Sequence, residues 1–296
     1  INTGTYDYLE YAHVYNGNVG LVVKEGDSDA YLELEAYAES NDLSNDQIFQ
    51  YLADQVNLIS VCDYIATEDF VYNSSWRHNR EFWRERKKGA KWHWILPDLD
   101  RGFQSSNLRS SLIDNFQDDY PLLEGIMDNE GFRNLLAQRY AAHLSITFFP
   151  DRIDDILESL DAPLLGEMNR HIDRWDNAGG IDSLRDRQDE LDEIRQFASE
   201  RAPEVLRGIQ DHLDMGDTVT VDLNTSPING GRILVAGVPA LLNFNKHFEL
   251  FKDIPVTISV EAAPGFIFEE WDDLNDASEV QEMIFRNSQT LTARFI

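Results

Sequence analysis

The chain has 296 residues, and its 42% hydrophobic and 11% aromatic content is that of a globular protein. Its 54 acidic residues against 25 basic ones give a formal net charge of −29, which argues against binding to nucleic acid. No apolar run reaches the roughly 18 residues needed to cross a bilayer, so we expect no transmembrane segment.

The segment 27–71 has the apolar spacing of two or three helices. Ser44 and Asn45 have the side chains typical of a helix start. Cys62 is the only cysteine and lies in an apolar run, so we expect no disulfide and interpret it as a small core residue.

The segment 81–99 changes to the alternation of strands around a hairpin. Phe82 precedes the basic turn 86–90, after which Trp92 and Trp94 alternate with polar residues. The prediction is therefore a second strand that ends at the acidic sequence Asp98-Leu99-Asp100.

Residues 118–144 repeat apolar side chains at helical spacing. Further helices are predicted over 151–160, 164–175 and 181–198, separated by Pro150, Pro163, Gly179-Gly180 and Pro203. Their outer faces are densely charged, as solvated helices usually are, and no site is predicted there.

From Met215 onward the pattern is that of strands, predicted at 219–223, 232–235, 256–260, 266–271 and 291–295. We interpret Trp271 as a core or edge residue rather than a sugar platform. The sequence thus predicts an α+β protein with a mainly helical region, residues 1–214, and an all-β region, residues 215–296.

Asp98 and Asp100 form the pair of residues best suited to metal chemistry. Successive side chains of a strand point to opposite faces, so two residues apart they would share one cleft. Mg²⁺ prefers one or two carboxylates together with water and substrate phosphates. Because Asp-x-Asp arises often by chance in so acidic a chain, the pair alone is a weak signal.

Polar residues next to this pair strengthen the signal. The segment 73–79 ends at Asn79, and Arg80 and Arg84 follow it. The alternative interpretation is a hairpin with a tryptophan-rich core face, in which the asparagines only cap a turn. Both interpretations are compatible, since aromatic residues can build a scaffold whose polar residues line a cleft.

The ordered motifs between about residues 22 and 213 resemble the spore-coat protein H (CotH) kinases, a family with a protein-kinase-like fold. They comprise Asp63-Tyr64-Ile65, the loop Asn73-x-x-Trp76-x-x-Asn79, a strand with Arg84, Lys91-Trp92-x-Trp94, Asp98-Leu99-Asp100, the helix start Asn129-Glu130-Gly131-Phe132-Arg133, and Arg139-Tyr140.

This resemblance implies transfer of phosphate from ATP to a protein Ser or Thr, assisted by Mg²⁺ or Mn²⁺. Asp98 or Asp100 would fill the metal-binding Asp role and Asn79 that of the second metal ligand, while Asn79, Arg80 and Arg84 would face the nucleotide. Positioning and charge neutralisation account for most of such catalysis.

At one catalytic position the chain departs from the family pattern. The family has an Asp before the loop tryptophan, and here that position is Ser75, whose hydroxyl is far too weak a base. His78 is the substitute that we consider, because neutral imidazole accepts a proton near pH 7. Its alternative role is that of a loop histidine bonded to the backbone.

The segment Gly17-Asn18-Val19-Gly20 and Lys24 do not have the spacing of a kinase phosphate loop and its lysine, which lies on a later strand. We interpret them as turn and strand. The nucleotide-covering lobe is then expected upstream of Ile1.

The resemblance also implies an extracytoplasmic location, secreted or at the cell surface, with a protein substrate or a surface or matrix component as partner. The all-β region resembles repeat domains of bacterial surface proteins. Two alternatives remain: a pseudokinase that serves as a structural or binding protein, and hydrolysis by paired carboxylates, for which no second motif is found.

Overall fold

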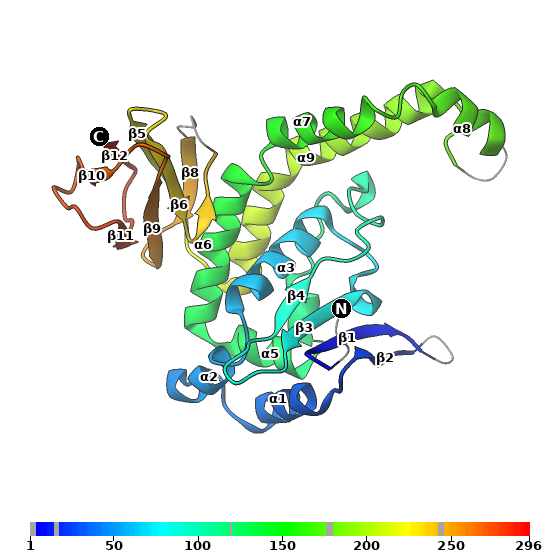
Figure 1. Cartoon of the computed structure of the whole chain (residues 1–296), viewed down its shortest axis with the longest axis horizontal. Helices are drawn as coiled ribbons and strands as arrows, with labels where there is room; N and C mark the ends of the chain where they lie inside the picture. The colour runs from blue at the N-terminus through cyan, green and yellow to red at the C-terminus, as the bar shows by residue number, and fades with distance from the viewer. Residues whose placement is uncertain (1–3, 15–17, 119, 176–179, 242–245) are drawn as a thin grey trace.

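The computed structural model describes residues 4–14, 18–118, 120–175, 180–241 and 246–296. Helices fill the middle of the molecule, a small sheet lies at the N-terminal end, and a second β region lies at the C-terminal end (Figure 1). This arrangement confirms the predicted α+β class. Within the described residues, no helix has the length and apolar character required to cross a membrane.

Four antiparallel strands form the N-terminal sheet in the order β2-β1-β3-β4. Their bounds are Tyr6–His13 for β1, Val19–Glu25 for β2, Arg80–Glu85 for β3 and His93–Ile95 for β4. Leu9 pairs with Phe82, and both are almost fully buried. Gly20 and Lys24 lie in β2, as the turn-and-strand interpretation expects, whereas Gly17 lies outside the described residues.

Three helices, α1 (Asp29–Ser40), α2 (Asp46–Ala53) and α3 (Leu58–Val71), follow the first hairpin. Asn45 caps α2 by accepting hydrogen bonds from the backbone N–H groups of Gln47 and Ile48, which confirms the predicted helix start. Helix α3 is buried along most of its length and contains Cys62, whose thiol pKa is raised by burial. The interpretation of Cys62 as a core residue is therefore confirmed.

The remaining helices are α4 (Ile113–Asp118), α5 (Pro121–Asp128), α6 (Glu130–Ile146), α7 (Pro150–Asp161), α8 (Met168–Trp175) and α9 (Leu184–Leu213). The sequence predicted that the helix over 181–198 ends before Pro203. This prediction is wrong, because Pro203 lies inside α9. An interior proline costs about 3 kcal/mol. Burial of Phe197, Val205 and Ile209 on the face of α9 that packs on the core outweighs that cost.

The C-terminal region contains two four-stranded sheets, ordered β10-β12-β5-β8 and β11-β9-β6-β7. The bounds are Thr218–Ser226 for β5, Gly231–Val235 for β6, Val238–Pro239 for β7, Lys246–Phe251 for β8, Pro255–Ala262 for β9, Phe268–Trp271 for β10, Val280–Ile284 for β11 and Gln289–Phe295 for β12. Strands β7, β8 and β11 were not predicted from the sequence. Trp271 is fully buried and donates its indole N–H to the Ser278 carbonyl, as expected of a core residue.

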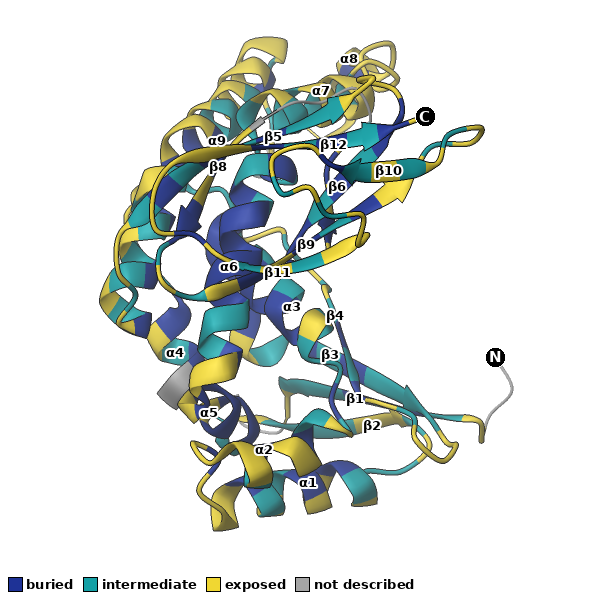
Figure 2. Cartoon of the chain, turned by 90° about the vertical axis from the view of Figure 1, so that its left-hand side faces the viewer, coloured by how far each residue is buried: buried dark blue, intermediate teal, exposed yellow. Residues whose placement is uncertain are grey.

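Helix α6 joins the helical region to the β region, and Figure 2 shows it buried between them. The Gln138 amide donates to the Phe251 carbonyl at 3.0 Å and accepts from the Phe251 N–H at 3.0 Å. Arg139 donates to the Ala236 carbonyl at 2.6 Å. One hydrophobic core therefore continues across both regions.

Candidate active site

The loop after α3 begins with a sharp change of backbone direction. Tyr72 has the left-handed φ of 49°, and its N–H and that of Asn73 close the helix end on the carbonyls of Asp69 and Glu68. This turn leads directly into the short 3₁₀-helix η2, Trp76–His78. The asparagine motif therefore starts from a fixed helix end.

Asn73 ties this loop to the acidic segment. Its side chain is fully buried, and Oδ1 accepts from the Ser75 N–H at 3.2 Å and from Ser75 Oγ at 2.9 Å. The amide nitrogen donates to the Asp98 carbonyl at 3.2 Å. Asn73 belongs to the sequence motif but was not predicted as a site residue, and its role becomes visible only through these contacts.

Asn79 and Asp98 are in direct contact. Asn79 Nδ2 donates to Asp98 Oδ2 at 3.0 Å and lies 3.4 Å from Ser75 Oγ. Asp98 is exposed, whereas Asn79 and Ser75 are half-buried. The fold thus brings together three predicted site residues from the two ends of the hairpin, 19 and 23 positions apart.

The predicted strand geometry of the acidic pair is wrong. Strand β4 ends at Ile95, before Pro97, and Asp98 has a left-handed φ of 51°. Asp100 lies in the turn that follows and is exposed. A proline cannot donate to a sheet, so the alternation of strand side chains does not extend to these two carboxylates. Of the two aspartates, it is Asp98 that contacts Asn79.

The donor set fits a hard cation. Asp98 supplies a carboxylate and Asn79 an amide oxygen, with Asp100 two residues further on, and these are the ligand types that Mg²⁺ takes together with phosphate oxygens. Among the described residues there is no group of three or more His, Cys, Asp or Glu side chains that could hold a metal ion. Asp98, Asn79 and Asp100 are therefore the residues that could hold such a cation.

Ser75 links the two asparagines of this loop. Its hydroxyl donates to Asn73 Oδ1, and its oxygen lies within reach of the Asn79 amide. Both bonds hold the two asparagines relative to each other. The Ser75 hydroxyl therefore serves to stabilise the loop, which agrees with its weakness as a base.

His78 stacks on His13, which lies at the end of β1. The ring centroids are 3.9 Å apart with planes inclined by 30°. Burial and the neighbouring His13 lower the pKa of His78 below its ordinary value of 6.5, although Asp98 opposes this shift. His78 is thus neutral at pH 7 and lies on the same turn as Ser75 and Asn79. The partner His13 was not found from the sequence, because β1 is far from η2 along the chain.

Arg80 and Arg84 occupy structural positions behind the loop. Arg80 is only 2% exposed, and its guanidinium lies 4.3 Å from the ring centroid of Tyr11 and 5.5 Å from that of Trp76. Arg84 pairs with the fully buried Asp7 at 3.0 Å. Neither residue has a contact with Asn79 or Asp98 that resembles a nucleotide clamp, so their predicted cofactor role stays a prediction.

Glu68 is a buried acid beneath the loop that the sequence did not reveal. It is fully buried, and neither carboxyl oxygen has a hydrogen-bond partner among the described residues. Burial raises the pKa of Glu68 to about 8, and the nearby Asn73 and Tyr64 side chains offset only part of this effect. At neutral pH the folded protein therefore keeps Glu68 mostly protonated.

Glu68→Gln is expected to flatten the pH dependence of stability. The folded pKa of about 8 exceeds the ordinary value of 4.5, so the unfolding free energy of the wild type falls as pH rises between these values. The slope is at most about 1.4 kcal/mol per pH unit. Urea unfolding from pH 5 to 9 measures it, with the exposed Glu190→Gln as control. An unchanged slope in Glu68→Gln would contradict the assignment.

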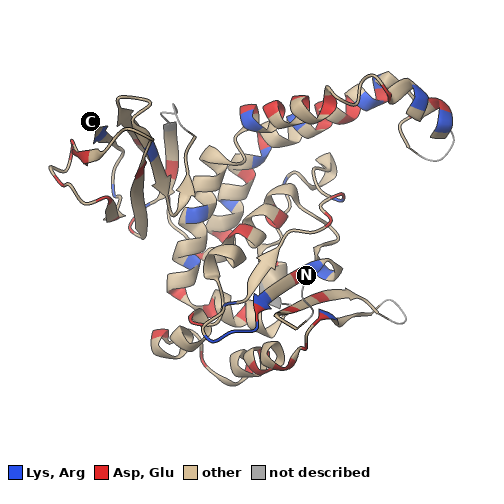
Figure 3. Ribbon diagram, in the orientation of Figure 1, with Lys and Arg blue, Asp and Glu red and all other residues tan. Residues whose placement is uncertain are grey.

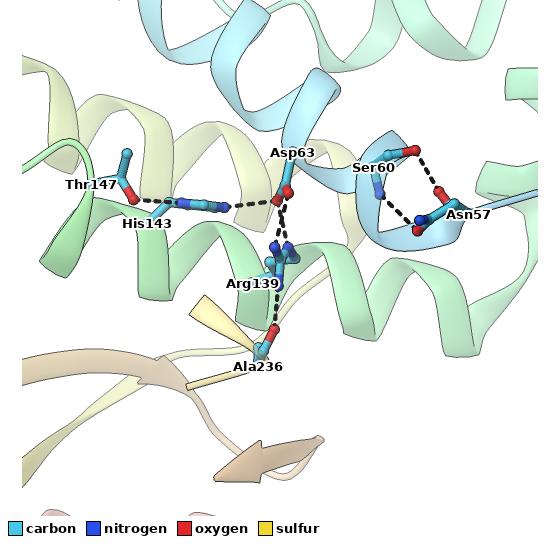
Figure 4. Close-up of polar contacts among 7 residues, drawn as sticks. All are labelled: Asn57, Ser60, Asp63, Arg139, His143, Thr147 and Ala236. Carbon is cyan, nitrogen blue, oxygen red and sulfur yellow. Dashed lines mark hydrogen bonds and ion pairs between the residues drawn. The ribbon is translucent and has the colours of Figure 1, made fainter. Parts of the chain in front are cut away.

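Two motifs of the sequence meet next to Ala236 of the β region (Figure 4). Asp63 of α3 accepts from Arg139 Nε at 2.5 Å and Nη2 at 2.9 Å, and lies 2.9 Å from His143 Nε2. Burial opposes ionisation of Asp63, but the His143 hydrogen bond and Arg139 outweigh it and lower its pKa to about 2. This cluster anchors α3 and α6 to the Ala236 turn, so we assign it a structural role.

Comparison with known protein families gives one match. The family model described as CotH kinase protein matches residues 8–205, which include the loop at Asn73 and the acidic segment at Asp98. Searches of curated proteins and of solved structures gave no match. Because the match covers about two thirds of the chain and contains the whole candidate site, this protein belongs to the CotH kinase family.

Proposed function

We propose that this protein is an extracytoplasmic kinase that transfers phosphate from ATP to a Ser or Thr hydroxyl of a protein, with Mg²⁺ or Mn²⁺. The observation that carries the proposal is the contact between Asn79 and Asp98, the two residue types that hold nucleotide-bound metal. Membership of the CotH kinase family supports a kinase-like function.

In this proposal Asp98 and Asn79, with Asp100, hold the metal, which neutralises charge on the phosphates when it is bound. The substrate hydroxyl oxygen attacks the γ-phosphorus, and the bond from that phosphorus to the β,γ-bridging oxygen breaks, which releases ADP. The hydroxyl proton passes to the neutral imidazole of His78. Ser75 and Asn73 keep Asn79 and the Asp98 segment in place.

His78→Gln is expected to lower kcat/KM for phosphate transfer by roughly a hundredfold, the lower range for loss of a general base. The pKa of His78 is lowered, so the wild type should keep its activity below pH 6.5 before an acid limb appears. That limb should be absent from the variant. The measurement is incorporation of labelled phosphate by the complete protein with Mg²⁺ or Mn²⁺ between pH 5 and 9.

His171→Gln is the matched control, since His171 is exposed on α8 far along the chain from the loop. Equal rates for wild type and His78→Gln would remove His78 from the mechanism but leave the kinase assignment in place. Absence of incorporation by the wild type with either metal would contradict the kinase and favour the pseudokinase alternative.

A further inference from the structure

The turn between β3 and β4 concentrates positive charge on a strongly acidic protein. Three of the six lysines of the sequence, Lys87, Lys88 and Lys91, lie within five positions. Arg86 beside them is neutralised by Asp7 and Asp27. Lys88 is exposed, and within the described part of the chain no ion pair is recorded for it. Figure 3 shows this basic turn as the blue loop leading out of β3.

A cavity of about 260 Å³ opens on the same turn. Its lining includes Trp83, Lys87, Lys91 and His93 together with Glu85, whose carboxylate pairs with the Lys87 ammonium group. The rings of Trp83 and His93 stack with centroids 5.1 Å apart and planes inclined by only 19°. The cavity thus combines stacked aromatic rings with the Lys91 ammonium group and the Lys87–Glu85 ion pair, and it lies outside the candidate active site.

Hydrogen bonds attach the end of the turn to the segment 53–57, so the cavity is formed before any ligand binds. Lys91 Nζ donates to the Ala53 carbonyl at 2.6 Å. The Trp92 N–H donates to the Gln55 carbonyl at 2.8 Å, and the Trp92 carbonyl accepts from the Asn57 N–H at 2.9 Å. A rigid site loses little conformational entropy when a ligand binds.

We propose that this cavity, with Lys87, Lys88 and Lys91 at its rim, is a docking site for an acidic peptide segment that carries an aromatic anchor. The anchor would pack on Trp83 and His93, and the flanking carboxylates would pair with Lys88 and Lys91, since Lys87 is already paired with Glu85. A volume of about 260 Å³ accommodates one or two side chains rather than a folded domain.

The overall charge selects this class of partner. A net charge of −29 repels extended polyanions such as nucleic acid and anionic membranes, whose fields act over a long range. At physiological salt the Debye length is about 8 Å, so a short peptide responds mainly to the charges next to it. The local excess of lysine therefore favours an acidic peptide.

The docking site is separate from the proposed catalytic site. Strand β3 has six residues and runs from Arg80, next to Asn79, to Glu85 at the cavity, which is a span of roughly 17 Å. The inference does not depend on phosphate transfer. A binding measurement without ATP can therefore fail or succeed independently of the proposed function.

The test measures fluorescence anisotropy of a labelled peptide with one phenylalanine flanked by glutamates, added to the complete protein. Lys88→Glu is expected to weaken binding roughly five- to tenfold, because it replaces an attraction with a repulsion at the rim. Arg170→Glu changes the net charge equally on the exposed surface of α8 and should leave binding nearly unchanged.

Three results would overturn the inference. One is that the peptide does not bind, and another is that Arg170→Glu weakens binding as much as Lys88→Glu. The third is that a peptide with alanine in place of phenylalanine binds equally well, because then the aromatic wall is not used. Vesicles of phosphatidylserine and phosphatidylcholine are tested in parallel, and binding of vesicles but not of peptide would also reject the proposal.

Discussion

Asp98→Asn is expected to reduce phosphate transfer by at least about a hundredfold, because a metal ligand contributes several kcal/mol to transition-state stabilisation. Asparagine keeps the size of the side chain and tolerates the left-handed φ of 51° at this position. The change therefore removes the charge without disturbing the turn. Labelled-phosphate incorporation and titration of Mn²⁺ in the presence of ATP measure the two effects.

Asp253→Asn provides a matched control. Asp253 is also exposed, has a left-handed φ of 60° and lies in the β region. It should leave both transfer and metal affinity unchanged. Asp100→Asn should have a smaller effect than Asp98→Asn, because only Asp98 contacts Asn79 directly. Full activity of Asp98→Asn would reject the metal site.

Arg201→Met is expected to destabilise the protein by about 3–5 kcal/mol, the range for breaking a buried charged network. Arg201 of α9 is 1% exposed and donates to the carbonyls of Asp69, Phe70 and Leu108 at 2.5–2.9 Å. Methionine fills part of the volume but removes the donor to the carbonyls of Phe70 and Leu108, while the Asp69 carbonyl keeps the Tyr72 N–H. Urea unfolding followed by tryptophan fluorescence measures the loss.

Arg207→Met on the same helix is the control, because Arg207 is exposed and, among the residues that the structure describes, forms an ion pair only with Glu204. It should change stability by less than about 0.5 kcal/mol. Arg201 holds the end of α3 immediately before the Asn73 loop, so Arg201→Met should also lower transfer activity. Equal stability of the two variants would contradict the role assigned to Arg201.

Local patterns predicted much of the fold. The cap at Asn45, the hairpin around the basic turn and the principal strands of the β region all follow from side-chain spacing and turn residues. These features depend on neighbours within a few positions, which the sequence displays directly. The continuation of α9 through Pro203 could not be predicted, because packing against distant residues decides it.

The candidate site, like the fold, was predicted from the sequence only in part. The sequence identified Asn79, Asp98 and Ser75 by their motif, but it assigned Asp98 and Asp100 to one strand face, which Pro97 and the left-handed backbone at Asp98 prevent. It gave no signal for Glu68 or for the stacking of His13 on His78. Burial and ring contacts arise between elements, so a residue's own neighbours do not reveal them.

Composition and motif order alone determined that this is an acidic α+β protein of the CotH kinase family, with its candidate chemistry between residues 73 and 100. Only the tertiary structure decided which polar groups meet. Asp7 neutralises Arg84 across 77 positions, Arg80 lies among aromatic rings, and Asp98 turns toward Asn79. The physical reason is that charge pairing and desolvation depend on distances in space, which only the packed chain defines.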